Sequence, residues 1–400
     1  MCSIGDDVFE NESDKLMPLE ETILSKTCIK CRTEPPCIVL RDKDSYCEAC
    51  FLAGTTHKFK ALLGKSRLIR PKDRVLIYHK VGHPSTALLH FLRAGLDLST
   101  PKKLRFEPVV LFIDDQYHLS LDERLELLKA VEQEIKSFGF KGNFVSFAEY
   151  VSNPAKIDEL ILSSDLQITQ DDQMKLSASI TKKCTTTSRK DIEDLLRRRL
   201  LLDVAKSRSC KFIFTPEISV DTASQLLTNI SLGRGSHIPN DTGFCDDRDD
   251  DVKILRPLRL FDMKELVLYN EINNSKPLSI RQPEVNPYSS VQDLMKKFVS
   301  DLQVNFPSTV NTILKTGDKL AVAESGPLKC KMCQGMLLKK SFLLTSEDST
   351  NFSHLVSTRS TDNTLSRQDR FRNVMDEFDN GMFDSSGLCY ACSKISDYLL

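Results

Sequence analysis

The sequence lacks long hydrophobic runs. No apolar stretch approaches the roughly 18 residues that a membrane helix needs, and residues 108–113 form one of the longest. The acidic first residues, which include Asp6 and Glu10, contain no apolar core of a secretory signal. An excess of one charge is also absent, because 55 basic residues balance 56 acidic ones. These absences predict a cytoplasmic protein without a membrane partner, in which any nucleic-acid binding depends on a local basic patch.

Cysteine is plentiful by contrast, and eight of the 13 cysteines form four Cys-x-x-Cys pairs. Cytosolic thiols stay reduced, so paired cysteines in this compartment are typical of metal sites rather than disulfides. Zinc prefers a tetrahedron of ligands, and one tight Cys-x-x-Cys turn supplies two thiolates. The sequence therefore predicts two structural zinc sites, one towards each end of the chain, with the ligands Cys28, Cys31, Cys47 and Cys50, and Cys330, Cys333, Cys389 and Cys392.

The spacing leaves other interpretations of these pairs open. An iron–sulfur cluster uses the same ligands and is not excluded by spacing. Free buried thiols and a thioredoxin-like redox pair are less favoured, since a redox pair is expected alone at a strand–helix junction. The cysteines without a partner at ligand spacing are interpreted as ordinary buried or loop residues: Cys2, Cys37, Cys184, Cys210 and Cys245.

Composition divides the chain into five segments. We predict an acidic flexible tail over residues 1–24, a four-cysteine zinc module with a β-hairpin over 25–56, and a basic segment over 57–72. An α/β domain is expected over residues 73–320. Residues 321–400 are predicted to form a second zinc module, a ribbon with a long polar insertion between its two cysteine pairs.

The α/β domain is predicted from strands and helices that alternate along the chain. Strands are expected at residues 75–78, 108–113, 144–148, 211–214 and 252–255. Helices are expected at residues 85–94, 121–138, 188–206 and 222–230, and another begins after Asp262 as its N-cap. Such alternation is typical of a parallel sheet covered on both faces, a three-layer fold. The polar stretches 166–187 and 239–251 are interpreted as surface loops.

The basic segment is a candidate nucleic-acid surface. In a chain of net charge −1 it concentrates Lys58, Lys60, Lys65, Arg67 and Arg70 directly after a zinc module. The alternative is a solvated helix face whose apolar residues pack inward, and both descriptions hold if one face packs while the other meets RNA. Arg197, Arg198 and Arg199 form a second basic cluster, of which Arg197 and Arg198 are predicted to bind tRNA along with the basic segment.

Few polar residues near the strand ends suggest catalysis. Asp114 and Asp115 follow a strand at its carboxyl end, where α/β folds place their sites. We interpret these two residues as a cap for the following helix, and His79 as a loop residue rather than a general base. His57 belongs to the basic segment.

At this point the residues resemble a known family. A four-cysteine module, the segment His-Lys-Phe-Lys-Ala-Leu-Leu-Gly-Lys-Ser-Arg at residues 57–67 and an α/β domain resemble the cytoplasmic tRNA 2-thiolation proteins. The similarity runs from about residue 28 to 392 and includes the Arg197-Arg198 pair, residues 210–230, the Arg-Pro-Leu-Arg of residues 256–259 and the last cysteine pairs. It is closer to the second, non-catalytic subunit than to the catalytic one.

The resemblance implies a PP-loop-like fold, of the adenine nucleotide alpha hydrolase type, with a degenerate loop. Catalytic members carry Ser-Gly-Gly-x-Asp-Ser after the first strand. Here Lys80 replaces the first serine, Val81 the first glycine and Pro84 the aspartate, while Gly82 and Ser85 remain. Loss of a glycine and of a backbone donor predicts a poor phosphate grip, so no ATP is expected. The cysteine pair that precedes the double arginine in catalytic members is also missing.

The resemblance further implies a function. The chain is expected to be a non-catalytic subunit that supports 2-thiolation of wobble uridine 34 in tRNA for lysine, glutamate and glutamine. Its expected partners are tRNA, a catalytic PP-loop subunit and, indirectly, a ubiquitin-like sulfur carrier. The alternatives are an active ATP-dependent tRNA thiolase and a zinc-module adaptor for protein assembly.

Overall fold

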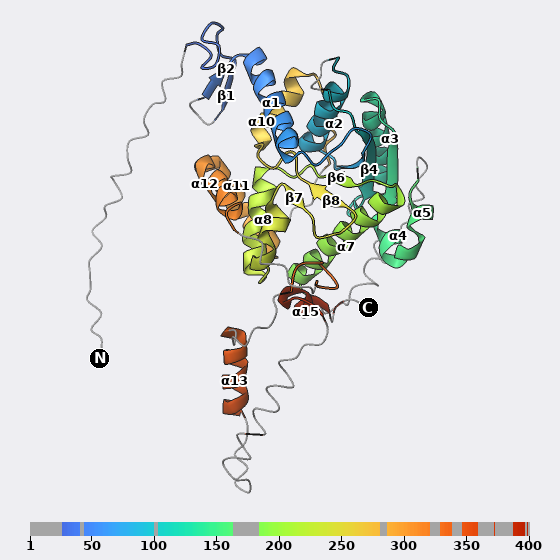
Figure 1. Cartoon of the computed structure of the whole chain (residues 1–400), viewed down its shortest axis with the longest axis vertical. Helices are drawn as coiled ribbons and strands as arrows, with labels where there is room; N and C mark the ends of the chain where they lie inside the picture. The colour runs from blue at the N-terminus through green and yellow to red at the C-terminus, as the bar shows by residue number, and fades with distance from the viewer. Residues whose placement is uncertain are drawn as a thin grey trace, which may run out of the picture. The chain divides into compact units, whose positions relative to one another are not determined.

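The computed structural model describes most of the chain (Figure 1). Described are residues 26–40, 44–99, 103–162, 184–280, 286–320, 329–337, 346–358, 372, 387–396 and 398. The predicted acidic tail, residues 166–183 of one polar stretch and most of the C-terminal insertion lie outside these residues. The chain divides into two compact units, residues 1–58 and 59–400. Among the described residues, no helix is both long and apolar enough to cross a membrane.

The first unit contains the predicted hairpin between the two cysteine pairs. Strands β1 (Ile38–Leu40) and β2 (Asp44–Tyr46) are antiparallel, and Ile38 pairs with Tyr46. The backbone N–H of Ile29 donates to Ser45 O at 2.9 Å, which ties the first cysteine turn to the hairpin. Helix α1 (Glu48–Ser66) begins directly after Cys47.

The second unit is built on a six-stranded sheet with the order β5-β4-β3-β6-β8-β7. Neighbouring strands are parallel except β7 and β8, which are antiparallel. The parallel sheet confirms the predicted α/β fold. The bounds of its strands are β3 (Arg74–His79), β4 (Glu107–Asp114), β5 (Gly142–Ser146), β6 (Phe212–Phe214), β7 (Cys245–Asp246) and β8 (Lys253–Leu255).

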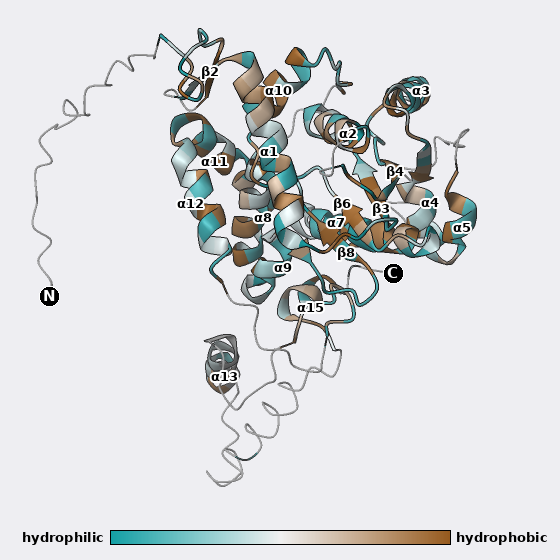
Figure 2. Ribbon diagram, turned by 45° about the horizontal axis from the view of Figure 1, so that its top comes forward, coloured by the Kyte–Doolittle hydropathy of each residue, from teal (hydrophilic) through white to brown (hydrophobic). Residues whose placement is uncertain are grey.

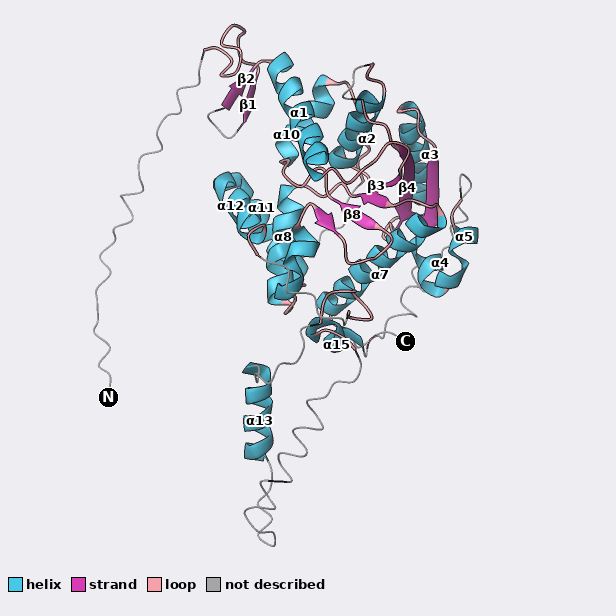
Figure 3. Ribbon diagram, in the orientation of Figure 1, coloured by secondary structure: helices cyan, strands magenta, loops and turns pink. Residues whose placement is uncertain are grey.

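Helices cover both faces of this sheet, as Figure 3 shows. On one face Leu76, Leu111 and Val145 pack against α4 (Phe147–Ser152) and α7 (Thr186–Ser207). On the other face His79 contacts α3 (Leu121–Ser137), and α2 (His83–Leu96) packs against α10 (Met263–Ile272). Alternation of side chains along the strands fills both layers, and hydrophobic residues gather on the sheet (Figure 2).

A side cluster of helices completes the second unit. Helix α8 (Ser219–Ser231) packs against α11 (Val291–Asn305) and α12 (Pro307–Gly317) through Ala223, Val299 and Leu314. Helices α11 and α12 were not predicted from the sequence. The remaining helices with bounds among the described residues are η1 (Pro154–Lys156), α5 (Ile157–Leu160), η2 (Gly235–His237), α9 (Ile238–Thr242), α13 (Ser346–Thr358) and α15 (Tyr390–Ser396).

The interpretation of residues 239–251 as a surface loop was wrong. This stretch contains most of α9 and all of β7, and Asp246, Arg248 and Asp249 are buried. Arg248 donates to Asp246 Oδ1 at 2.9 Å and also pairs with Asp241. The acidic run suggested solvation, but arginines inside the fold neutralise its charges.

Several element boundaries also differ from prediction; α7 and α8, for example, begin two and three residues earlier than expected. The third strand ends at Ser146, so Phe147 and Ala148 open α4 instead of closing the strand. Helix α2 begins at His83 rather than Ser85, because Pro84 fits the first turn of a helix, where no backbone donor is needed.

Candidate metal centres and the carboxyl edge of the sheet

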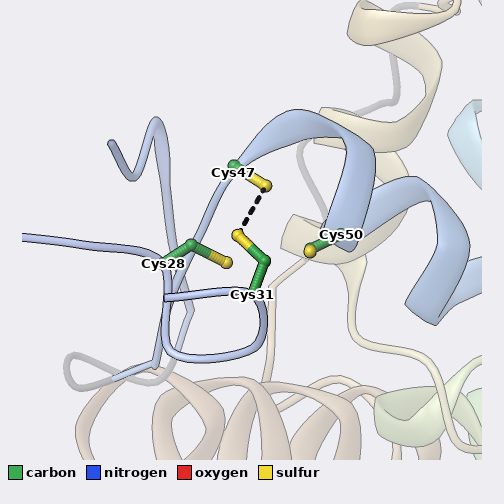
Figure 4. A group of neighbouring side chains, drawn as sticks. All are labelled: Cys28, Cys31, Cys47 and Cys50. Atoms are coloured by element: carbon green, nitrogen blue, oxygen red, sulfur yellow. Dashed lines mark hydrogen bonds between the residues drawn. The ribbon is translucent and has the colours of Figure 1, made fainter. Parts of the chain in front are cut away.

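The first four-cysteine site lies in the first unit. Cys28 and Cys31 come from a tight turn, Cys47 precedes α1 and Cys50 lies in its first turn. The four sulfur atoms lie within 4.8 Å of one another, and Figure 4 shows them pointing to a common centre. The Thr33 hydroxyl and the backbone N–H groups of Glu34 and Thr33 lower the pKa of Cys31 to about 6. This favours the thiolate form that binds metal.

The second site joins residues from the two ends of the predicted ribbon. Cys330 and Cys333 lie on a turn, Cys389 precedes α15 and Cys392 belongs to that helix. Their sulfur atoms also lie within 4.8 Å of one another. Two backbone N–H groups point at ligand sulfurs: Gly335 N lies 3.4 Å from Cys333 Sγ, and Cys389 N lies 3.3 Å from Cys330 Sγ.

Both donor sets fit a single tetrahedral ion. With zinc–sulfur bonds of about 2.3 Å, neighbouring sulfurs lie about 3.8 Å apart. The Cys31–Cys47 and Cys333–Cys389 sulfur distances are 3.8 and 3.7 Å. In a four-iron cluster each cysteine binds a different iron, which spaces the sulfurs more widely. The structure therefore brings each predicted quartet together as a group that could hold a metal ion, and its role as a ligand set stays a prediction.

The predicted basic segment has one packed and one open face. Lys58 and Lys60 are partly buried on α1, whereas Lys65 and Arg67 near its end and Arg70 beyond it are exposed. Phe59 and Leu63 are buried, and the ring of Phe59 stacks on Phe91 with centroids 4.9 Å apart. The structure thus places these cations where solvent reaches them, and their binding to tRNA stays a prediction.

The double arginine on α7 points into the protein. Arg197 donates to Asp115 and Asp194 at 2.9 Å each, and its guanidinium lies 5.4 Å from the ring centroid of Phe147. Its side chain is 20% exposed. Arg198 donates to Asp246 Oδ2 at 3.2 Å and to Gln334 at 2.9 Å. Both arginines have structural partners.

The third arginine in this run is the exposed one. Arg199 faces solvent, whereas its two neighbours are partly buried. The three arginines are consecutive in the sequence, so composition alone does not distinguish them. On α7 each successive residue points in a different direction, and this turns Arg199 to solvent and the other two towards the protein. Arg199 was not among the predicted tRNA-binding residues.

The loop between β3 and α2 contains the predicted degenerate PP-loop. Gly82 has a φ of +126°, a backbone conformation that favours glycine. The backbone N–H of Lys80 donates to Ser85 Oγ at 2.9 Å, so the loop uses its serine internally. The Lys80 side chain is exposed, while Ser85 is buried.

The interpretation of Asp114 and Asp115 as a helix cap was wrong. Ser120 caps α3, accepting the backbone N–H of Glu123 in a capping box. Asp114 instead forms a buried ion pair with Arg124, and Asp115 pairs with Arg197. The capping serine lies five residues further along, next to the helix that it caps.

His79 and the cysteines Cys184 and Cys210 belong to neither of the two four-cysteine groups. His79 is no loop residue: it is the last residue of β3, buried, with Nε2 3.3 Å from Glu134 Oε2. Cys184 and Cys210 belong to different hydrophobic clusters, and burial raises the pKa of Cys210 to about 11. Neither joins a metal-binding group among the described residues.

The fold and its two four-cysteine sites define a class of protein. The structure is similar to that of the U34-tRNA thiolase NcsA from Methanococcus maripaludis with its 4Fe–4S cluster. The TM-score is 0.57 at 18% identity, and the match covers 79% of this chain and 99% of that one. At this identity the similarity establishes the fold that the chain shares with that thiolase, and nothing of its activity.

Sequence comparisons narrow this class to one family. Residues 290–394 match the family model described as cytoplasmic tRNA 2-thiolation protein 2. Proteins of that name from Aedes aegypti and Homo sapiens are 32% and 30% identical, with alignments that cover 84% and 83% of this chain and 76% of each relative. The chain belongs to the cytoplasmic tRNA 2-thiolation protein 2 family, which confirms the resemblance and assigns it to tRNA 2-thiolation. The relatives' names describe those proteins as cytoplasmic, in agreement with the prediction.

Proposed function

We propose that this chain is the non-catalytic subunit of a complex that 2-thiolates wobble uridine 34 of tRNA. It binds tRNA and a catalytic PP-loop subunit, to which a ubiquitin-like carrier delivers sulfur, and it holds no ATP itself. The observation that carries this proposal is the loop of residues 80–85, which stands where the PP-loop of catalytic members is expected.

The geometry of this loop supports a weak phosphate grip. The N–H of Lys80 already has an acceptor in Ser85 Oγ. Pro84 has no N–H, and Val81 lacks the freedom with which glycine turns its amide towards an anion. The start of α2, through its helix dipole, and the exposed side chain of Lys80 remain to attract a phosphate.

Ion pairs at the carboxyl edge of the sheet also support the absence of catalysis. Asp115, directly after β4, pairs with Arg197, and Glu217 after β6 accepts from Arg256 Nε at 2.6 Å. Pairing with arginine lowers the proton affinity of these carboxylates and occupies part of their acceptor capacity, which makes them poorer general bases.

We further propose zinc at both four-cysteine sites, in structural roles. Sulfur spacings near 3.8 Å support one tetrahedral ion per site. The basic segment of residues 57–72 then lies immediately after the first zinc module in sequence, and its exposed cations supply contacts to tRNA phosphates.

The ATP prediction is tested by calorimetry on the purified chain with magnesium and ATP. We expect no binding at micromolar ATP. At Val81 the loop lacks the backbone flexibility of a glycine, and at Pro84 it lacks a backbone N–H donor. Lys80→Ala serves as the matched variant. Micromolar affinity that disappears in Lys80→Ala would instead favour the active thiolase.

The tRNA prediction is tested by charge reversal. Replacing Lys60, Lys65, Arg67 and Arg70 with glutamate should weaken tRNA binding at least about 10-fold and reduce the salt dependence by about one unit of slope per lost phosphate contact. The control replaces four exposed lysines of α11, α12 and the residues just beyond with glutamate, namely Lys296, Lys297, Lys315 and Lys319. Equal affinity of both variants would contradict a tRNA contact in the basic segment and favour the adaptor.

A further inference from the structure

The C-terminal four-cysteine site has charged neighbours that contribute no metal ligand. Arg234, which follows α8, is 5% exposed, and its Nη2 lies 3.8 Å from Cys392 Sγ. The same nitrogen donates to Asp191 Oδ2 on α7 at 2.8 Å, and Nη1 donates to the other oxygen of that carboxylate. The guanidinium thus bridges a ligand sulfur and a buried carboxylate of the α/β domain.

His237 approaches a different ligand of the same site, Cys333. Its Nδ1 lies 3.9 Å from Cys333 Sγ, its Nε2 lies 3.4 Å from Met336 O, and the residue is 3% exposed. The ring lies where a side chain at position 335 would be, because a Cβ on Gly335 would come within 2.3 Å of it. The glycine between the cysteine turn and the polar shell is therefore a packing requirement.

A second layer of polar contacts continues from the cysteine turn into the sheet. Gln334 accepts from Arg198 and donates to Asp249 at 3.3 Å. Lys329 Nζ donates to Arg248 O at 2.8 Å. These contacts join the site to residues 246–249, which follow or belong to β7.

We propose that Arg234 and His237 form the outer shell of a C-terminal metal centre, touching ligand sulfurs without binding the metal, and that metal binding there locks residues 234–249 against α7. This inference rests on the proposed metal. Four thiolates around a divalent ion carry a net charge of −2, which is costly to bury without a compensating cation. Arg234 directs one guanidinium N–H at the Cys392 sulfur, and Asp191, which pairs with the same guanidinium, fixes its orientation, as partners of ligands generally do in protein metal sites.

The first experiment measures metal release from the full chain into excess chelator. In Arg234→Gln we expect one metal equivalent to leave about 10- to 100-fold faster than in the wild type, while the other equivalent leaves at the wild-type rate. The control is Arg93→Gln, which removes an exposed arginine paired with Asp97 on α2. Release of both equivalents at wild-type rates would overturn the role of Arg234.

A spectroscopic readout separates the outer shell from a merely structural role. In cobalt-substituted protein the sulfur-to-cobalt charge-transfer band should move to lower energy in Arg234→Gln, since the sulfur electrons lose a stabilising positive charge. Arg234→Lys keeps that charge and should shift the band less. An identical band in the wild type and both variants would overturn the contact.

Hydrogen exchange tests the locking. Removing metal from the wild type should speed exchange in residues 234–249 and in α7, with α3 unchanged as the internal control. Unchanged exchange in residues 234–249 would overturn the locking. A wild type that binds no metal would overturn both this inference and the zinc proposal, whereas loaded protein with a normal Arg234→Gln variant would overturn this inference alone.

Discussion

The two four-cysteine sites use the same ligands but are built at different distances along the chain. In the first, 15 residues separate the pairs and form a hairpin that closes the module locally. In the second, 55 residues separate the pairs, and the site is held by Arg234, His237 and Gln334. The first site is supported by residues close to its ligands in sequence. The second site is supported instead by side chains of the α/β domain that contact its cysteine turns.

Removing one cysteine ligand from each site should show the largest difference in stability between the two sites. Cys392→Ser should lower the free energy of unfolding of the second unit by more than about 5 kcal/mol, because ligand loss forfeits metal binding that is also folding energy. Cys31→Ser should leave the second unit within about 0.5 kcal/mol. Denaturant unfolding, monitored by hydrogen exchange within each unit, measures the free-energy change in both variants. Equal destabilisation of the second unit by the two variants would contradict this difference.

The polar layer beneath the second site provides the next largest effect. Asp246→Asn should cost about 3 kcal/mol, since it leaves buried Arg198 with a neutral partner and takes from Arg248 one of the two carboxylates that pair with it, the other being Asp241. Asp97→Asn, in an exposed pair, should cost almost nothing. Thermal or urea unfolding compares the two variants, and similar losses would show that the buried network adds little.

The same carboxylate predicts a dependence on acid. Burial raises the pKa of Asp246, but Arg248 and Arg198 outweigh burial and hold the pKa well below its usual value. Because the folded-state pKa is lowered, the stabilisation is present above about pH 4 and is lost as pH falls towards the lowered pKa. Asp246→Asn should therefore lose less stability than the wild type between about pH 4 and 2.

Two glycine-to-alanine substitutions, one beside the second cysteine site and one in α1, should have the smallest effects on stability. Gly335→Ala should destabilise the second site by about 2 kcal/mol, because the new Cβ would meet the ring of His237. At Gly64, near the end of α1, a Cβ meets no atom within 4 Å, so alanine there should stabilise the helix by about 0.5 kcal/mol. Thermal unfolding measures both changes. A neutral Gly335→Ala would mean that the turn moves away from His237 at no cost.

Long periodic segments were predictable from the sequence. The apolar run of β4 and the spacing in α3 placed both elements within one residue at each end. Strand β7 has only two residues, and α9 has five, which is too short for a period to emerge. Helices α11 and α12 were missed although their apolar faces pack on α8.

The sites divide in the same manner. Ligand quartets follow from spacing because one turn supplies two sulfurs, so both sets were found from the sequence. The directions of Arg197 and Arg198 depend on Asp115 and Asp246, which lie 82 and 48 residues away. The outer contacts of Arg234 and His237 are of the same kind, and their residues carry no local signal for a metal site.

The wide separation of the last two cysteine pairs bears on how the length of the stretch between them affects stability. The entropy lost in closing a loop grows only with the logarithm of its length, so doubling the 55 residues between Cys333 and Cys389 would add about 0.6 kcal/mol. Insertions and deletions between these pairs are therefore nearly neutral for stability. The length of this stretch can therefore change at little cost in closure entropy while the two cysteine pairs stay joined.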